Sequence, residues 1–255
     1  MTVLAPTPLE DPVAEARRIV EAASAAGLPI RVVGGVGVAL VAPSVGRLQP
    51  PRTYHDIDLA APTGAPTIIR LMTALGYRAS TRFNALNGSE RLLFHDPGGR
   101  RIDVFIDTLR MCHELPFRDR LGAWPWTLPA ADLLLSKLQI VELTDRDAQD
   151  VLALLTDQEL SETGDEGIEL PRIRELCGRD WGWWRTVDDN LTSLIGRWTE
   201  PTPPGTRAPA TLAAPVEHAR ALRKTLATCP KSIGWRARAV VGPRMRWYDL
   251  PEEVR

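Results

Sequence analysis

Two aspartates stand one residue apart in the otherwise apolar run YHDIDLA, residues 54–60. Alternate side chains of an extended strand point to the same face, so Asp56 and Asp58 should share a face opposite Ile57 and Leu59. Two like charges this close repel each other, and burying part of such a pair is unfavourable unless a cation neutralises it. The spacing therefore predicts a binding site for a divalent metal or a basic partner.

A second strand-like run, RIDVFID at 101–107, repeats this pattern of apolar residues alternating with acids. The residues before it, DPGG at 96–99, are typical of a hairpin turn, so the run should be paired with a preceding strand. Its outward face carries Asp103 and Asp107. We expect Asp103 to join the first two carboxylates in one acidic cluster, with Asp107 as the alternative member.

Glycines and a cation stand upstream of the aspartate pair. Gly34 and Gly35 follow a predicted buried strand at 30–33 and precede a short apolar helix. A glycine-led turn lets the backbone approach a ligand and presents free N–H groups at the start of a helix. The loop 43–53 should carry Arg52 towards the acidic pair.

The other expected elements are helices and strands of ordinary length. Asp11 should cap a first helix that ends at Gly27, and Thr144 should cap a later one. A strongly apolar helix at 129–143 carries one conspicuous cation, Lys137. The remaining expected helices span 63–76, 171–177, 180–198 and 216–228, and the remaining expected strands span 77–81 and 91–95.

Composition describes an ordinary globular protein of 255 residues whose net charge of -1 conceals an asymmetry. Nine Lys/Arg and one acid lie between Pro203 and Tyr248, so this basic tail favours an anionic partner or docking on the acidic remainder. The three dispersed cysteines form no metal-binding pair, and no apolar run approaches the length of a membrane span. We expect a cytoplasmic protein with buried thiols and no membrane partner.

The combination of these features resembles the nucleotidyltransferase superfamily typified by DNA polymerase beta and the aminoglycoside nucleotidyltransferases. The matching residues are Gly34-Gly35, Asp56-Ile57-Asp58 and Asp103. The closer likeness is to the AbiEii-type nucleotidyltransferases of bacterial toxin–antitoxin and phage-defence systems. It rests on Arg52-Thr53 before HDIDL, on IDVFID, and on Lys137 with Arg146-Asp147 and Asp150.

This resemblance covers roughly residues 28–156 and implies an α+β fold. A nucleotidyltransferase-like mixed sheet with flanking helices would occupy a catalytic domain at 1–158. A mainly helical C-terminal region would follow at 159–255, with a proline-rich linker at 200–215 before the basic tail.

The activity implied is Mg²⁺-dependent transfer of a nucleoside monophosphate from an NTP, such as ATP, to an acceptor hydroxyl. Two ions would be held by Asp56, Asp58 and Asp103, which are also the catalytic residues. Gly34, Gly35, Arg52 and Lys137 would bind the nucleotide, with Lys137 and Arg52 neutralising phosphate charge.

The acceptor stays open among RNA or a tRNA end, a small molecule and a protein hydroxyl. The resemblance also raises a toxin role with an antitoxin protein as partner. Family members often carry Ser or Thr beside the glycines, whereas this chain has Gly-Gly-Val-Gly. That difference favours the alternative hypothesis, a non-catalytic module that binds a nucleotide or a partner on a degenerate nucleotidyltransferase fold. A metal-dependent phosphodiesterase is a third, weaker hypothesis, because the four histidines form no spaced cluster.

Overall fold

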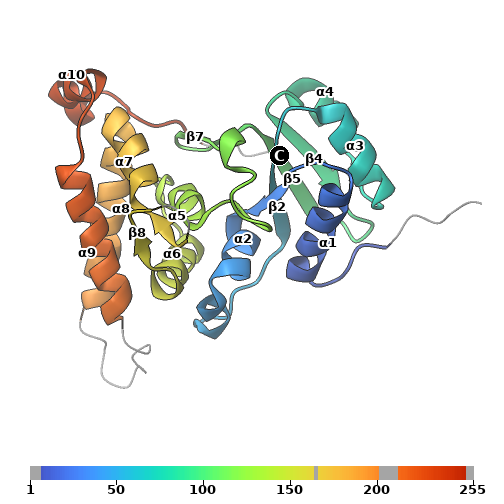
Figure 1. Ribbon diagram of the computed structural model, residues 1–255, viewed down its shortest axis with the longest axis horizontal. Coiled ribbons are helices and arrows are strands. Elements are labelled where there is room, and N and C mark those ends of the chain that lie inside the picture. The colour runs from blue at the N-terminus through green and yellow to red at the C-terminus, as the bar shows by residue number, and fades with distance from the viewer. Residues whose placement is uncertain (1–6, 164–165, 201–211, 251–255) are drawn as a thin grey trace, which may run out of the picture. The chain divides into compact units, whose positions relative to one another are not determined.

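The structure is a computed structural model that describes residues 7–163, 166–200 and 212–250. It is an α+β protein with a mixed sheet, flanking helices and a helical C-terminal region, which confirms the predicted fold class (Figure 1). The chain forms two compact units. The first unit comprises 1–41, 52–109 and 115–129, and the second comprises 42–51, 110–114 and 130–255.

A five-stranded sheet forms the centre of the first unit. Its order is β1 (Arg31–Val33), β2 (Asp56–Ala61), β5 (Arg101–Ile106), β4 (Arg91–His95) and β3 (Arg78–Ala79). Strands β2 and β5 are parallel, whereas each of the other neighbouring pairs is antiparallel. The predicted strand at 91–95 and the hairpin into β5 are confirmed.

One face of this sheet is apolar and carries the core of the unit. Helices α1 (Pro12–Ala25) and α3 (Ala65–Ala74) pack on it, and Ile19, Ile57 and Met72 are completely buried there. Apolar side chains recur about every 3.6 residues in the helices and every second residue in the strands, so they meet between the helices and this face of the sheet. The opposite face of the sheet therefore bears the polar residues of β2 and β5.

Two helices of the first unit differ from the sequence-based expectation. Helix α2 (Gly34–Val41) begins directly at the end of β1, so the glycines form its first turn and not a separate loop. Helix α4 (Thr81–Asn87) was not predicted, and it limits the strand expected at 77–81 to the two residues of β3. Its Asn84 accepts from Leu93 N and donates to Leu93 O, at 2.7 and 3.2 Å.

The outer strand β1 is covered at its edge by the segment 126–128. The backbone of Val32 donates to Trp126 O at 2.9 Å and accepts from Leu128 N at 3.3 Å. The segment 126–128 thus satisfies hydrogen-bonding groups that a further strand would otherwise take.

The second unit is mainly helical. Helix α6 has the predicted cap, because Thr144 and Asp147 form a reciprocal capping box. The helix expected at 129–143 ends earlier, at Leu138, and the basic stretch contains a helix that was not predicted, α10. The helices are α5 (Ala130–Leu138), α6 (Asp145–Asp157), α7 (Leu170–Arg179), α8 (Trp181–Thr199), α9 (Ala213–Thr228) and α10 (Ile233–Val241).

Short elements complete the chain. The small pairs are β6 (Thr108–Arg110) with β7 (Glu114–Pro116), and β8 (Leu160–Ser161) with β9 (Ile168–Glu169). Short 3-10 turns span Pro43–Arg47, Arg118–Arg120 and Gly242–Arg244.

The contacts place α5 and α6 in the second unit, whereas the sequence-based division grouped them with residues 1–158. Of the predicted linker 200–215, residues 201–211 lie outside the described residues, and α9 begins at Ala213. Cys112, Cys177 and Cys229 are free and buried, as predicted. Within the described ranges, no helix combines the length and apolarity needed to cross a membrane.

Candidate functional site

The aspartate pair lies on the polar face of β2, as the alternation of the strand predicts. Ile57 and Leu59 are completely buried on the opposite face. Asp56, the first residue of the strand, is exposed, whereas Asp58 is half-buried. The two carboxylates therefore point to one side of the sheet at different depths.

Asp103 occupies the position directly beside Asp58 on the neighbouring strand. Strands β2 and β5 run parallel with Asp58 opposite Asp103 and Asp56 opposite Arg101. Residues paired across a ladder point to the same face, and adjacent strands are about 4.8 Å apart. The predicted convergence of β2 and β5 at these positions is therefore present in the register.

The carboxylate of Asp103 is bound by two arginines. Arg91 on β4 donates from Nε to Oδ1 at 2.8 Å, and its Nη2 forms an ion pair with the same oxygen at 2.8 Å. Arg101 donates from Nε to Oδ2 at 2.6 Å. Only 1% of the Asp103 side chain is exposed. Both oxygens thus accept from guanidinium groups, and these pairs offset the cost of burying the charge.

Gly34 lies against Asp58 at the start of α2. Its φ of +64° is in the left-handed region, which favours glycine, and a Cβ at this position would collide with Oδ2 of Asp58. The first turn of an α-helix carries backbone N–H groups without intrahelical partners. The glycine therefore allows the carboxylate and the helix start to approach each other.

Arg52 lies beside the next glycine. A Cβ at Gly35 would come within 2.8 Å of Arg52 Nη2 and 3.3 Å of the Tyr54 ring. The Arg52 guanidinium lies over that ring at 5.2 Å from its centroid and donates to Thr53 O at 3.1 Å. The structure thus brings together four predicted site positions, namely the two glycines, Arg52 and Asp58.

Lys137 belongs to the second unit. It pairs with Asp150 at 2.9 Å and with Asp147 at 3.2 Å, both on α6. Asp150 is completely buried, whereas Lys137 is 12% exposed at its side chain. The helical set of Lys137, Asp147 and Asp150 is therefore an ion-pair cluster, and a nucleotide-binding role for Lys137 stays a prediction.

The donor set fits one hard cation better than the expected pair. Across the described parts of the chain, no three His, Cys, Asp or Glu side chains gather so that they could hold a metal ion. Asp103 contributes no ligand in this arrangement, because a cation beside it would meet two guanidinium charges. Asp56 and Asp58 alone suit Mg²⁺, which is commonly held by one or two carboxylates with water and substrate phosphates completing the shell.

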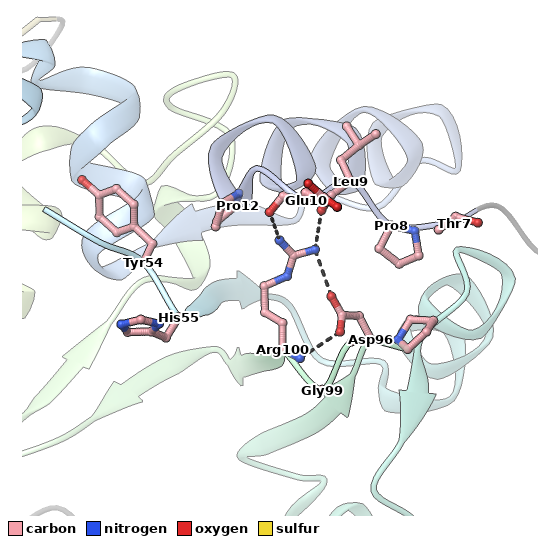
Figure 2. Close-up of a pocket in the computed structure, with 12 residues that line it drawn as sticks. Thr7, Pro8, Leu9, Glu10, Pro12, Tyr54, His55, Asp96, Gly99 and Arg100 are labelled. Carbon is pink, nitrogen blue, oxygen red and sulfur yellow. Dashed lines mark hydrogen bonds and ion pairs between the residues drawn. The ribbon is translucent and has the colours of Figure 1, made fainter.

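A surface cavity of about 510 Å³ lies near the beginning of β2. Tyr54 and His55 line one side of it, and Figure 2 shows Arg100 between Asp96 and the segment before α1. Arg100 donates to Leu9 O at 2.7 Å and to Glu10 O at 3.0 Å, and pairs with Asp96 at 3.1 Å. These contacts hold the segment before α1 on the hairpin turn, and the lining includes neither carboxylate of the predicted pair.

Arg91 and Arg101 are the site residues that sequence reasoning missed. Arg101 precedes Asp103 by two residues, so strand alternation alone places both on one face. Arg91 is harder to find, because its approach depends on the β4–β5 pairing, in which Leu93 lies opposite Asp103.

Comparison with known proteins gives only distant likenesses. Neither a protein-family model nor a curated protein sequence matches the chain. Among solved structures, the chain is similar to the solution structure of the antibiotic-resistance factor ANT(2'')-Ia, at 15% identity and a TM-score of 0.36 over 54% of this chain and 79% of that one. It is also similar to an antigenic nucleotidyltransferase-like protein from Paracoccidioides brasiliensis, at 12% identity and a TM-score of 0.32 over 90% of this chain and 98% of that one.

Proposed function

We propose that the chain is a nucleotidyltransferase that transfers a nucleoside monophosphate from an NTP to an acceptor hydroxyl and releases pyrophosphate. The observation that carries the proposal is the contact between Asp58 and Gly34. It joins a strand face with two carboxylates to the first turn of α2. A cation-binding pair beside an anion-binding helix start is the arrangement that a metal–triphosphate complex requires.

Each residue then has a separate task. The N–H groups of Gly34 and Gly35 would face the triphosphate, and Arg52, packed on Gly35, would neutralise part of its charge. Asp56 and Asp58 would hold Mg²⁺. When bound, this ion supplies positive charge that stabilises the negative charge developing during phosphoryl transfer. We propose one ion at this pair, because the two arginines at Asp103 oppose the expected second one.

The proposal includes three classes of acceptor. RNA or a tRNA end, a small molecule and a protein hydroxyl each offer the required nucleophile. The AbiEii-type resemblance, which rests on Arg52-Thr53, IDVFID and the Lys137 set, favours a nucleic-acid acceptor and a toxin partnered by an antitoxin. The basic tail agrees with an anionic partner.

Labelling with each of the four NTPs tests the proposal. The purified full chain is incubated with Mg²⁺, total RNA and a labelled NTP, and label is measured in RNA, protein and small-molecule fractions. Asp58→Asn should lose the labelling, whereas Asp119→Asn, an exposed aspartate in the first unit, should keep it. Equal labelling by the two variants would disprove the assignment.

The alternative is a non-catalytic module that binds a nucleotide or a partner on the same fold. The engagement of Asp103 by Arg91 and Arg101 favours it, since the third acid is then not available as a metal ligand. Calorimetry separates the two functions. NTP binding without turnover on any acceptor fraction would support the module, and labelled product would exclude it.

A further inference from the structure

The two arginines at Asp103 carry one positive charge more than is needed to neutralise the buried carboxylate. One arginine would neutralise the carboxylate, yet both Arg91 and Arg101 bind it. The carboxylate is covered, while the side chains of Arg91 and Arg101 remain 22% and 35% exposed. The excess charge therefore lies at the surface of the cluster and not beneath it.

Arg101 has hydrogen-bonding capacity left after this pairing. Its contact with Asp103 uses Nε, and within the described part of the chain its Nη1 and Nη2 groups have no partner. A guanidinium carries five N–H donors in a planar fork that matches the oxygens of a phosphate. Arg101 can thus hold Asp103 and a ligand oxygen simultaneously.

Arg91 is held in a fixed plane. Its guanidinium lies over the Phe105 ring, 5.0 Å from the centroid, while its Nε donates to Asp103 and its Nη2 is ion-paired with the same carboxylate. A group fixed in this way loses little conformational freedom when it binds an anion, so less of the binding free energy is spent on ordering it.

The two arginines share a sheet face with the acidic pair. Arg101 lies opposite Asp56 in the ladder between β2 and β5, and His95 lies opposite Arg101 on β4. The acids on β2 and Arg101 on β5 therefore lie about one strand spacing apart, or about 4.8 Å, whereas Arg91 on β4 lies one strand further away. A phosphate beside a cation held by Asp56 would come within reach of Arg101.

We infer that Asp103 is a positioning residue that orients Arg91 and Arg101 to bind a phosphate group of the substrate. This inference rests on the proposed function, because it assigns how the same site recognises a phosphate-bearing substrate. The phosphate belongs either to the NTP or to the backbone of a polynucleotide acceptor.

Binding measurements without any divalent cation test the pair. Fluorescence anisotropy follows a labelled single-stranded RNA oligonucleotide, and calorimetry follows ATP, each with the full chain in EDTA. The variants are Arg91→Gln and Arg101→Gln. The matched control is Arg70→Gln, which removes an exposed arginine of α3, the helix on the opposite face of the sheet.

The affinity for one probe should fall about tenfold in each site variant, as expected for loss of a charge-assisted hydrogen bond. If RNA is the ligand, the slope of log affinity against log salt should also fall by about 0.7 for each arginine removed. Weakening of ATP alone would assign the pair to the donor. Affinities for both probes equal to those of Arg70→Gln would overturn the inference.

Asp103→Asn gives the sharper result, because simple electrostatics and the positioning role predict opposite changes in the affinity for an anion. Removing a negative charge near a phosphate strengthens anion binding by simple electrostatics. If Asp103 orients the two arginines, its loss should instead weaken anion binding, by a factor similar to that of Arg101→Gln. Arg101→Lys should recover only part of the affinity that Arg101→Gln loses, because lysine lacks the planar guanidinium fork. Stronger or unchanged binding by Asp103→Asn would overturn the positioning role.

These results are independent of turnover. If the site variants lose anion binding but no NTP labels any acceptor, the inference stands and the proposed activity fails. If labelling depends on Asp58 while Arg91→Gln and Arg101→Gln bind both probes normally, the activity stands and the inference fails.

Discussion

Asp58 and Asp103 lie directly opposite each other on parallel strands, yet their carboxylates have different surroundings. Asp58 lies against Gly34 at the start of a helix, whereas Asp103 is enclosed by Arg91 and Arg101. The same sheet face thus offers a position suited to a cation and another suited to an anion.

Replacing Asp58 by Asn should reduce nucleotidyl transfer by about 100-fold or more, because a group that stabilises charge at the reacting phosphate is lost. The half-buried side chain keeps its volume, so the midpoint of thermal unfolding should change little. Initial rates at several Mg²⁺ concentrations provide the measurement. A variant that regains the full rate as Mg²⁺ rises would show weaker ion binding only, and an unchanged rate at every concentration would contradict the prediction.

Gly34→Ala should impair both folding and activity. The left-handed backbone alone costs about 1–2 kcal/mol for a residue with a Cβ, and this Cβ would also displace Asp58. Gly27→Ala is the matched control, since Gly27 has a φ of +72° with no atom within 4 Å of the added Cβ. Urea unfolding should show a larger decrease in the free energy of unfolding for Gly34→Ala than for Gly27→Ala. Only Gly34→Ala should lose nucleotidyl transfer. Equal losses would mean that Asp58 moves aside freely.

Lys137→Ala should lower the free energy of unfolding by about 3 kcal/mol, because it removes a cation from the completely buried Asp150. The exposed pair between Arg197 and Asp145 is the control, and Arg197→Ala should have little effect. The double variant Lys137→Met with Asp150→Leu separates stability from function. If it folds normally but transfers no nucleotide, Lys137 has the predicted role at the phosphates, whereas full activity would assign it to stability alone.

His113 should make the second unit sensitive to acid. Burial lowers its pKa to about 4 from an ordinary 6.5, and its ring lies 5.1 Å from Trp183 and 2.9 Å from the Thr186 hydroxyl. Because the folded state resists protonation, the stability contributed by neutral His113 is complete above about pH 6.5. It is lost as the pH falls towards 4.

The measurement compares the wild type with His113→Gln by urea unfolding, followed by tryptophan fluorescence. The free energy of unfolding of the wild type, relative to that of His113→Gln, should fall by up to about 3 kcal/mol between pH 7 and pH 4. One pKa unit corresponds to about 1.4 kcal/mol. Asp180 and Asp249 attract the proton and oppose the effect of burial. A difference that does not vary with pH would contradict the lowered pKa.

Local patterns were sufficient for much of the fold. Alternation in DIDL and RIDVFI placed the aspartates on one face, and the Asp11 and Thr144 caps placed the starts of α1 and α6. These features depend on residues a few positions apart, so the sequence displays them directly.

Long-range pairing accounts for what was missed. Arg91 reaches Asp103 only because β4 pairs with β5, and α4 forms in a segment, 81–87, that lacks a regular apolar stripe. The anchoring of Asn84 on Leu93 stabilises that segment in place of the helix's own periodicity. The contacts of α5 and α6 group these helices with the second unit, although they follow the sheet in sequence.

The outer strands of the sheet have a consequence for aggregation. Asn84 occupies the backbone groups of Leu93 where β3 ends, and residues 126–128 occupy those of Val32 on β1. An intruding strand from another molecule therefore finds the donors and acceptors of Val32 and Leu93 already engaged. These contacts shorten the open backbone edge that the sheet offers to a neighbouring molecule as a template for fibre growth.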